Sequence, residues 1–262
     1  MHPKQLPAAR AGSGIFARAV VLAAILVLVA QLPVEAARTS VIHAGPRASG
    51  GVALTFDDGW GEASCERIVR TLRRERVTAT FFINGVHLRA QPARWRRILK
   101  GFPVANHTRS HPNLANVSAY EIRRQLRTNE AIHKQVLGRP LLKVLRPPYG
   151  AYDKQVVEVA RKLGYRYVVL WNRSAADTSP AATVNSIVRH TTGAPKGSII
   201  LMHCARSITA DALPRIIRSY KRRGIKLIGL DQMLGLGSTA PRKELPYPLG
   251  RGPTEPKSSI RP

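Results

Sequence analysis

The sequence is poor in cysteine and in acidic residues, and both shortages narrow what the protein can be. Its 262 residues include two cysteines, too few for a disulfide-dense miniprotein or a four-thiolate zinc site. Glycine and proline follow no three-residue period, which excludes collagen. Hydrophobic residues make up 44% of the chain, close to the globular average, so the chain is not wholly disordered. The length allows one large domain or two small ones with a substantial core.

The shortage of acidic residues leaves a strong positive charge. Asp and Glu number 15 against 42 Lys and Arg, a formal charge of +27. Since +2 falls on residues 1–37 and +3 on residues 238–262, +22 remains on residues 38–237. Such a field attracts nucleic acid, anionic lipid heads or an anionic cell-wall polymer. An arginine-rich coding bias would produce the same composition without any binding role.

No apolar run is long enough for an ordinary membrane span, which needs roughly 20 residues. The longest runs from Ala19 to Leu32, after three basic residues, and the small residues Val34 and Ala36 follow it. A basic start, a short apolar run and a small-residue exit are typical of a secretory signal peptide. We therefore predict a signal peptide over residues 1–37, with an uncleaved signal anchor as the alternative. Either puts the body outside the cytoplasm, secreted or associated with the cell wall.

The carboxyl-terminal residues 238–262 hold six prolines and no apolar period. This composition predicts a disordered, proline-rich tail. Residues 38–237 then remain as one folded domain.

Within that domain no repeat of 20–50 residues occurs, but short apolar runs alternate with longer basic amphipathic runs. Strands alternating with helices predict a parallel α/β sheet. Seven or eight such units in about 200 residues favour a closed barrel, with its chemistry at the carboxyl ends of the strands. The expected strands are 51–56, 78–83, 104–106, 143–145, 165–171, 198–202 and 226–229, and the expected helices are 62–75, 92–99, 117–137, 154–163, 182–190 and 213–222.

Two adjacent carboxylates, Asp57 and Asp58, follow the strand-like GVALTF and precede Gly59. Adjacent carboxylates repel each other, so a bound cation is the usual reason for both to stay ionised. Asp-Gly is also common in solvated turns, and the pair alone does not decide between the two interpretations.

His107 and His111 lie four residues apart in NHTRSHP. On one helical turn that spacing puts both imidazoles on the same face, where they can bind one metal. With Asp58 they make a two-His, one-carboxylate set with open positions, which suits catalytic zinc or another divalent ion.

Three further residues follow predicted strands. Arg146 begins the rigid RPPYG loop, which includes Tyr149, and His203 follows the apolar SIILM. Asp177 follows the strand predicted at 165–171. Taken singly, the RPPYG loop and His203 are more typical of a structural role, and Asp177 is uninformative.

Together the motifs TFDDG (55–59), HTRSHP (107–112), RPPYG (146–150) and LMH (201–203), in this order, resemble those of the NodB-type polysaccharide deacetylases, carbohydrate esterase family 4. The resemblance extends over roughly residues 52–234. It implies a distorted (β/α) barrel of about seven units. It also implies one divalent metal, most often Zn²⁺ with Co²⁺ or Mn²⁺ as alternatives, and the removal of acetyl groups from N-acetylated or O-acetylated polysaccharides.

Carried over by motif, Asp57 corresponds to the general base, and Arg146 to the arginine that pairs with it. The resemblance makes Asp58, His107 and His111 the metal ligands and the backbone amide of Tyr149 an oxyanion donor. His203 corresponds to the general acid, and Asp177 to the carboxylate that tunes it. The chain departs from the family pattern at Thr178, where a tryptophan is common, and at Cys204, where an aspartate is common.

Several alternatives stay open at this stage. A glycosidase needs two carboxylates roughly 5–10 Å apart across a cleft, and it leaves the histidine pair unexplained. A non-catalytic polysaccharide-binding relative of the same fold is a second alternative, and an O-acetyl xylan esterase a third. The hypothesis of a nucleic-acid-binding protein rests on charge alone, since the sequence contains no nucleic-acid-binding motif. The sequence does not choose between peptidoglycan, chitin oligomers and other N-acetylglucosamine polymers, although basicity favours an anionic cell wall. We expect a monomer.

The two cysteines carry a prediction of their own. An exported protein meets oxidising conditions, and two is the minimum even number. Cys65 lies seven residues beyond Asp58, and Cys204 directly follows His203. We therefore predict a disulfide across the mouth of the barrel, with two buried free thiols as the alternative.

Overall fold

The central strand β2 (Gly51–Asp57) is buried along all seven residues, as expected for a parallel strand covered on both faces. Its side chains alternate between two hydrophobic clusters. Phe56 belongs to a cluster with residues of the outer helices, whereas Ala53 belongs to a cluster with residues from six other strands. Thr55 and Asp57 share the parity of Ala53, so they face the interior of a curled sheet.

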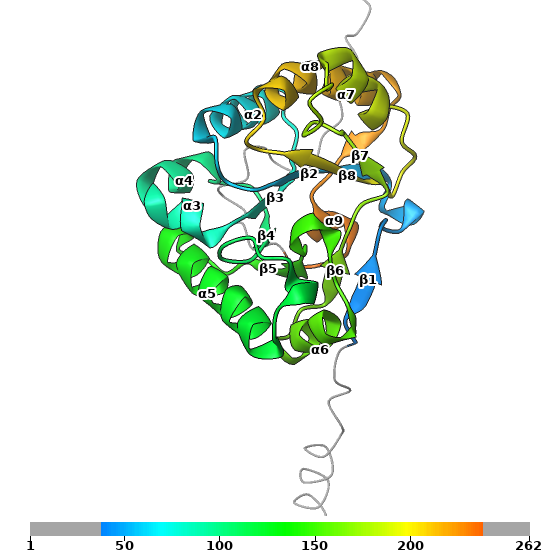
Figure 1. Ribbon diagram of the computed structural model, residues 1–262. Helices are drawn as coiled ribbons and strands as arrows, with labels where there is room; N and C mark the ends of the chain where they lie inside the picture. Colours follow the sequence, from blue (N-terminus) through cyan, green and yellow to red (C-terminus); the bar gives the residue numbers. More distant parts are fainter. Residues whose placement is uncertain (1–37, 238–262) are drawn as a thin grey trace, which may run out of the picture. The chain divides into compact units, whose positions relative to one another are not determined.

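One parallel sheet runs through the domain, in the order β1-β6-β5-β4-β3-β2-β8-β7. The short strand β9 lies outside this order and pairs with the first residues of β2, which also pairs with β3 and β8. Figure 1 shows this sheet curling around the centre of the molecule. The remaining strands are β1 (Ser40–Ile42), β3 (Thr80–Ile83), β4 (Val104–Asn106), β5 (Leu142–Leu145), β6 (Tyr167–Val169), β7 (Arg173–Ser174), β8 (Ile199–His203) and β9 (Lys226–Leu227).

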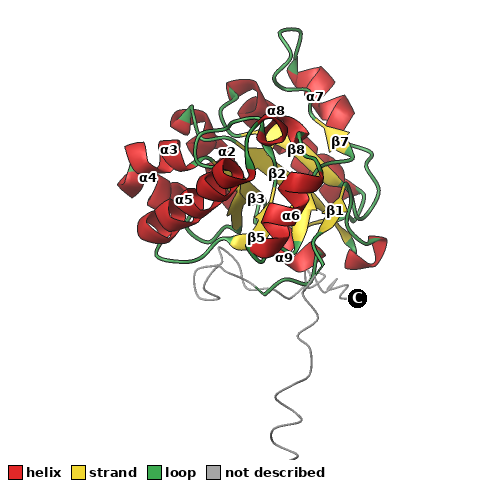
Figure 2. Ribbon diagram, turned by 60° about the horizontal axis from the view of Figure 1, so that its bottom comes forward, coloured by secondary structure: helices red, strands yellow, loops and turns green. Residues whose placement is uncertain are grey.

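Helices cover the outside of the sheet, except for the short helix Leu230–Met233, whose two buried residues belong to the inner cluster (Figures 1 and 2). The longest, α5, begins after Ser118, whose hydroxyl accepts a hydrogen bond from the Glu121 amide, and ends at Gly138 in the left-handed conformation. Both are standard ways of satisfying the free backbone groups at helix ends. The helices are α2 (Glu62–Arg74), α3 (Gly85–Ala90), α4 (Pro92–Ile98), α5 (Ala119–Leu137), α6 (Lys154–Lys162), α7 (Val184–Thr191), α8 (Ser207–Arg222) and α9 (Leu230–Met233).

The α/β class and the distorted barrel are confirmed, but the barrel is not closed by strand pairing. The sheet ends at β1 and β7, which do not pair with each other within residues 38–237. A single antiparallel bridge between Ala44 and Ser198 spans this region instead. Full closure was wrong because β1 has three residues and β7 two, too few to form the ladder that a closed barrel needs.

The sequence located the strand and helix alternation but missed its shortest members. The expected strand at 104–106 is β4 as observed, and the expected helix at 213–222 begins six residues earlier, at Ser207. β1, β7, α3 and α9 were not predicted, and each has at most six residues. Elements this short carry too few positions to show a hydrophobic period.

The computed structural model describes residues 38–237. The signal peptide or anchor predicted at 1–37 and the tail predicted at 238–262 lie outside the described residues. Among residues 38–237, no helix is both long enough and apolar enough to cross a bilayer.

Candidate active site

The site forms where neighbouring parallel strands end. β2 ends at Asp57, His107 follows β4, Arg146 follows β5, and β8 ends at His203. Because the carboxyl ends of parallel strands meet at the same edge of a sheet, residues almost 150 positions apart come together. In the register of the sheet Asp57 lies directly opposite His203.

Asp58, His107 and His111 form a cluster that can hold a metal ion. Their ligand atoms all lie within 4.8 Å of one another. Asp58 Oδ1 lies 3.5 Å from His107 Nε2 and 3.3 Å from His111 Nε2. This oxygen is buried and has no hydrogen-bond partner in the described chain. An unpartnered buried carboxylate oxygen beside two imidazole nitrogens is what a divalent cation would satisfy, so the residues fit a metal.

Both histidines turn Nε2 toward Asp58 Oδ1. His107 Nδ1 lies 2.7 Å from the Arg146 carbonyl oxygen, so Nδ1 carries the proton and Nε2 keeps its lone pair, a common arrangement for ligating histidines. Burial, followed by the neighbouring His107, lowers the pKa of His111 to about 4. The His111 ring is therefore neutral at pH 7, as a ligand must be.

The ligand loop is not a helical turn. Residues 107–111 are irregular, and Thr108 and His111 have φ angles of 68° and 63°. Asp58, Tyr149 and Ala176 also have positive φ, at 71°, 61° and 53°. Left-handed backbone costs energy in residues with a side chain, and such strain concentrates at functional sites. Five of the six such residues between 38 and 237 belong to loops of this site.

Arg146 is wholly buried, and its guanidinium makes four hydrogen bonds. It donates to Asp57 Oδ1 at 2.7 Å, to Thr55 Oγ1 at 2.8 Å and to two backbone carbonyls. The guanidinium carbon also lies 4.2 Å above the centroid of the Phe82 ring. A buried carboxylate is stable when it is paired and hydrogen-bonded, and Arg146 pairs Asp57 through Oδ1. Asp57 Oδ2 lies 3.8 Å from His107 Nε2, beyond hydrogen-bond distance.

His203 is held by Asp177. Asp177 Oδ1 lies 2.8 Å from His203 Nδ1, and Oδ2 accepts hydrogen bonds from the His203 amide and the Thr209 hydroxyl at 2.8 and 2.5 Å. Burial acts to lower the pKa of His203, but the hydrogen bond and charge of Asp177 outweigh it and raise that pKa. The imidazolium form of His203 is thereby favoured, with Nε2 at its free end.

Tyr149 stands beside the cluster of Asp58, His107 and His111. Its ring is exposed to 70% and meets the His111 imidazole edge-on, with centroids 4.7 Å apart. It sits within the short 3₁₀ turn Pro148–Gly150. This contact brings the backbone of the turn next to the ligand cluster.

The structure thus brings all eight residues selected from the sequence to one edge of the sheet. It adds polar residues that sequence reasoning missed. Asn84, which follows β3, donates to the His107 carbonyl at 2.8 Å. Asn106 Oδ1 accepts the Thr108 amide at 2.8 Å and so shapes the ligand loop. Both are polar residues at strand ends, the same signal that selected Asp57 and His203.

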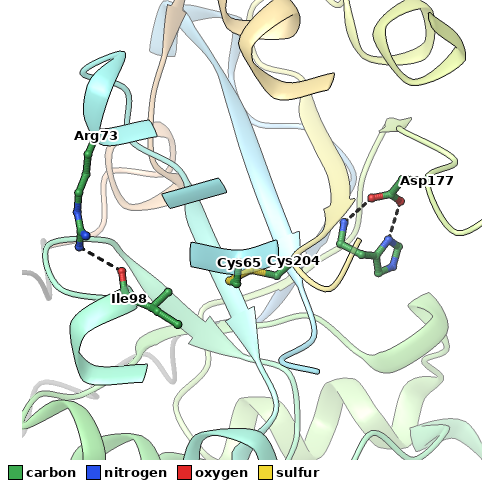
Figure 3. The surroundings of a disulfide bond; sticks show 6 residues. Cys65, Arg73, Ile98, Asp177 and Cys204 are labelled. Atoms are coloured by element: carbon green, nitrogen blue, oxygen red, sulfur yellow. Dashed lines mark hydrogen bonds and ion pairs between the residues drawn. A yellow bond between two sulfur atoms is a disulfide. The ribbon is translucent and has the colours of Figure 1, made fainter. Parts of the chain in front are cut away.

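The predicted disulfide is present in the structure. Cys65 in α2 and Cys204 after β8 are bonded, with their Cα atoms 4.8 Å apart. Figure 3 shows this bond together with Asp177 and its hydrogen bonds. The segment that follows His203 is therefore tied to α2, the first helix after β2.

Comparison with protein families gives a match from residue 44 to residue 168, to the family described as Polysaccharide deacetylase. The peptidoglycan-N-acetylglucosamine deacetylase PgdA of Listeria monocytogenes is 32% identical over 186 residues, 70% of this chain and 39% of that protein. A peptidoglycan-N-acetylglucosamine deacetylase of Bacillus cereus is 33% identical over 195 residues, 72% of this chain and 70% of that protein. This chain therefore spans about two fifths of the length of the Listeria relative.

Solved structures give the same picture. The Bc1960 peptidoglycan N-acetylglucosamine deacetylase is similar over 78% of this chain and 96% of that chain, with a TM-score of 0.72 and 31% identity. BA3943 of Bacillus anthracis, described as a CE4 family pseudoenzyme, is similar over 74% of this chain and 69% of that chain, with a TM-score of 0.70 and 26% identity. Because the same fold occurs in a pseudoenzyme, the individual site residues have to carry the functional argument.

Proposed function

The chain belongs to the polysaccharide deacetylase family, carbohydrate esterase family 4, and from this we propose that it hydrolyses the N-acetyl amide of N-acetylglucosamine units in peptidoglycan. Deacetylases of peptidoglycan among its relatives support this substrate. Chitin oligomers share the same acetylated sugar, and acetylated xylan shares the acetyl group, so both belong in the same assay.

We propose Asp58, His107 and His111 as the ligands of one divalent metal, Zn²⁺ in the first instance and Co²⁺ or Mn²⁺ as alternatives. Two imidazoles and one carboxylate leave coordination positions open for catalysis. A bound ion would polarise the acetyl carbonyl and lower the pKa of a water molecule. The protein's own part is to hold these ligands, with Asn84 and Asn106 fixing the loop that carries both histidines.

Asp57 is the proposed general base. Arg146 donates a hydrogen bond to Oδ1 at 2.7 Å, which orients the carboxylate and leaves Oδ2 on the other side. Oδ2 makes no hydrogen bond to His107, so it is available to take a proton from the attacking water. Arg146 acts here as a positioning residue through its hydrogen bond.

His203 is the proposed general acid. The amine produced by amide cleavage has to leave protonated, and an imidazolium with a raised pKa can donate that proton from Nε2. Asp177 holds the other ring nitrogen, Nδ1. The backbone amide of Tyr149 is the proposed oxyanion donor, and a well-placed donor contributes about 3 kcal/mol.

The observation that carries the proposal is that three groups of residues meet at the carboxyl edge of the sheet: the cluster of Asp58, His107 and His111, the Asp57–Arg146 pair and the His203–Asp177 pair. Polysaccharide binding alone does not require a buried carboxylate, a histidine hydrogen-bonded to a second carboxylate and a cluster that fits a metal ion. The geometry therefore favours an enzyme over the non-catalytic alternative.

The test measures acetate release from peptidoglycan, tetra-N-acetylglucosamine and acetylated xylan by the purified full chain, before and after chelation and with each metal restored. Activity should vanish on chelation and return with metal. Asp57→Asn should lower turnover by about 10²–10⁴ and keep its metal, as expected for loss of a general base, whereas Asp58→Asn should lose both.

Asp211→Asn is the matched control, because Asp211 is an exposed carboxylate on α8 paired with Arg67. It should behave as wild type. Full activity of the metal-free protein would refute the proposed function, and a metal-free Asp57→Asn variant would make Asp57 a ligand instead of the base.

For location we propose the cell exterior, since deacetylases of peptidoglycan act on the wall and a disulfide persists in oxidising compartments. We propose a monomer that contacts anionic wall polymer through its basic surface. A surface hollow between α5, β5 and α6 is lined by four basic side chains and one acidic one: Arg127, Lys134, Lys143, Lys162 and Glu130. Binding to a purified anionic wall polymer should weaken with rising salt concentration.

A further inference from the structure

Trp60 is exposed although tryptophan is the largest apolar side chain. Of the chain's three tryptophans, Trp95 is wholly buried and Trp171 partly so, whereas Trp60 is exposed to 44%. Single exposed apolar side chains are common on protein surfaces, so the surroundings of Trp60 have to show whether this ring has a role.

The backbone around Trp60 is held closely on both sides. A side chain at Gly59 would come within 2.8 Å of His87 Cβ, and one at Gly61 would come within 2.9 Å of the Ala205 carbonyl oxygen. Gly61 also has a φ of +80°, which favours glycine. Both glycines therefore allow close contacts that fix this loop between α3 and the segment after His203.

The Trp60 ring itself is fixed by two imidazoles. It meets His87 with centroids 5.5 Å apart and His111 at 5.7 Å, both edge to face. Such pairs are favourable geometries for aromatic rings. Tyr149, exposed to 70%, meets the same His111 ring at 4.7 Å. Two exposed aromatic side chains thus contact one proposed metal ligand.

We propose that Trp60 is a stacking platform for a second sugar ring of the polysaccharide, next to the unit whose acetyl group is removed. A pyranose has a face of C–H groups that packs flat on an aromatic ring, while its hydroxyls remain at the rim. A rigid aromatic side chain provides this contact area at little cost in side-chain entropy. The inference rests on the proposed function and specifies how that site takes a polymer in preference to a monosaccharide.

The first experiment compares kcat/KM for tetra-N-acetylglucosamine and for N-acetylglucosamine in wild type, Trp60→Ala and Trp60→Phe. The ratio of tetramer to monomer should fall at least about fivefold in Trp60→Ala, the size expected for a lost aromatic contact, and Trp60→Phe should recover part of it. Metal content, measured in each variant, should not change. Tyr120→Ala removes another exposed aromatic ring, on the first turn of α5, and should leave both values unchanged.

A second experiment needs no catalysis. Tryptophan fluorescence is titrated with tetra-N-acetylglucosamine in wild type and in Trp60→Phe. A change that is saturable in wild type and lost in Trp60→Phe supports the platform, even if the protein releases no acetate and the proposed function fails. An unchanged tetramer-to-monomer ratio in an active Trp60→Ala, or a titration identical in Trp60→Phe and wild type, would overturn it.

Discussion

Removing the disulfide tests how much of the site depends on one covalent link. The double variant Cys65→Ala/Cys204→Ala keeps both positions apolar, as their complete burial requires, and removes the only two cysteines of the chain. The bond joins residues 139 positions apart. For a loop of this length the chain-entropy model gives about 5 kcal/mol of unfolding free energy at 25 °C, and measured losses for native disulfides are typically about 2–5 kcal/mol.

That loss converts to a change in melting temperature. For domains of about 150–250 residues, 1 kcal/mol corresponds to roughly 2–4 °C, so the double variant should melt about 5–20 °C below wild type. Calorimetry or circular dichroism measures the shift. Reducing agent should lower the Tm of wild type by a similar amount and should leave the double variant unchanged, which separates the bond from the loss of two sulfur atoms.

The same variant should also lose turnover. Cys204 directly follows His203, and its bond to Cys65 ties that segment to α2. Below the melting transition kcat should fall while metal content stays constant, because the ligands lie on other loops. A Tm within about 2 °C of wild type, or two reactive thiols per chain in denatured, non-reduced protein, would refute the reasoning.

Three further predictions concern the charged pairs of the site. If His203 acts as imidazolium, kcat should fall as pH rises through the raised pKa of His203. Asp177→Asn should move that decline to lower pH, because burial then lowers the pKa of the ring without the opposing carboxylate. The pH profile of kcat, measured for both proteins, tests this role of His203. The contribution of this ion pair to stability should be complete just below the ordinary His pKa of 6.5, where Asp177 with its lowered pKa is still ionised, and should be lost as pH rises through the raised pKa of His203. Melting curves across that range measure the loss. Arg146→Lys should lower kcat and should lower the free energy of unfolding by about 3 kcal/mol. An ammonium cannot reproduce the four hydrogen bonds of the buried guanidinium, and it leaves Asp57 poorly paired. A Lys variant with wild-type turnover and Tm would contradict the positioning role proposed for Arg146.

The sequence by itself indicated the fold class, which the structure confirms, and the candidate residues of the site. Apolar runs such as GVALTF mark buried strands wherever they occur, and amphipathic runs mark the covering helices, because burial dictates both periods. Polar residues placed directly after apolar runs, Asp57 and His203 among them, stand out because a strand end is where a buried side chain can reach a ligand. The four motifs then identified the family.

Only the tertiary structure decided how these residues work together. The separation of roles between Asp57 and Asp58 depends on Arg146, 89 positions away, which engages one carboxylate, while the other faces two imidazoles. The pKa of His203 depends on Asp177 and on burial, neither of which its own neighbourhood in the sequence specifies. Incomplete closure of the barrel and the close fit of Gly59 and Gly61 around Trp60 likewise arise from contacts between distant segments. Local sequence governs periodicity and turn chemistry, whereas distances between distant side chains exist only once the sheet has curled.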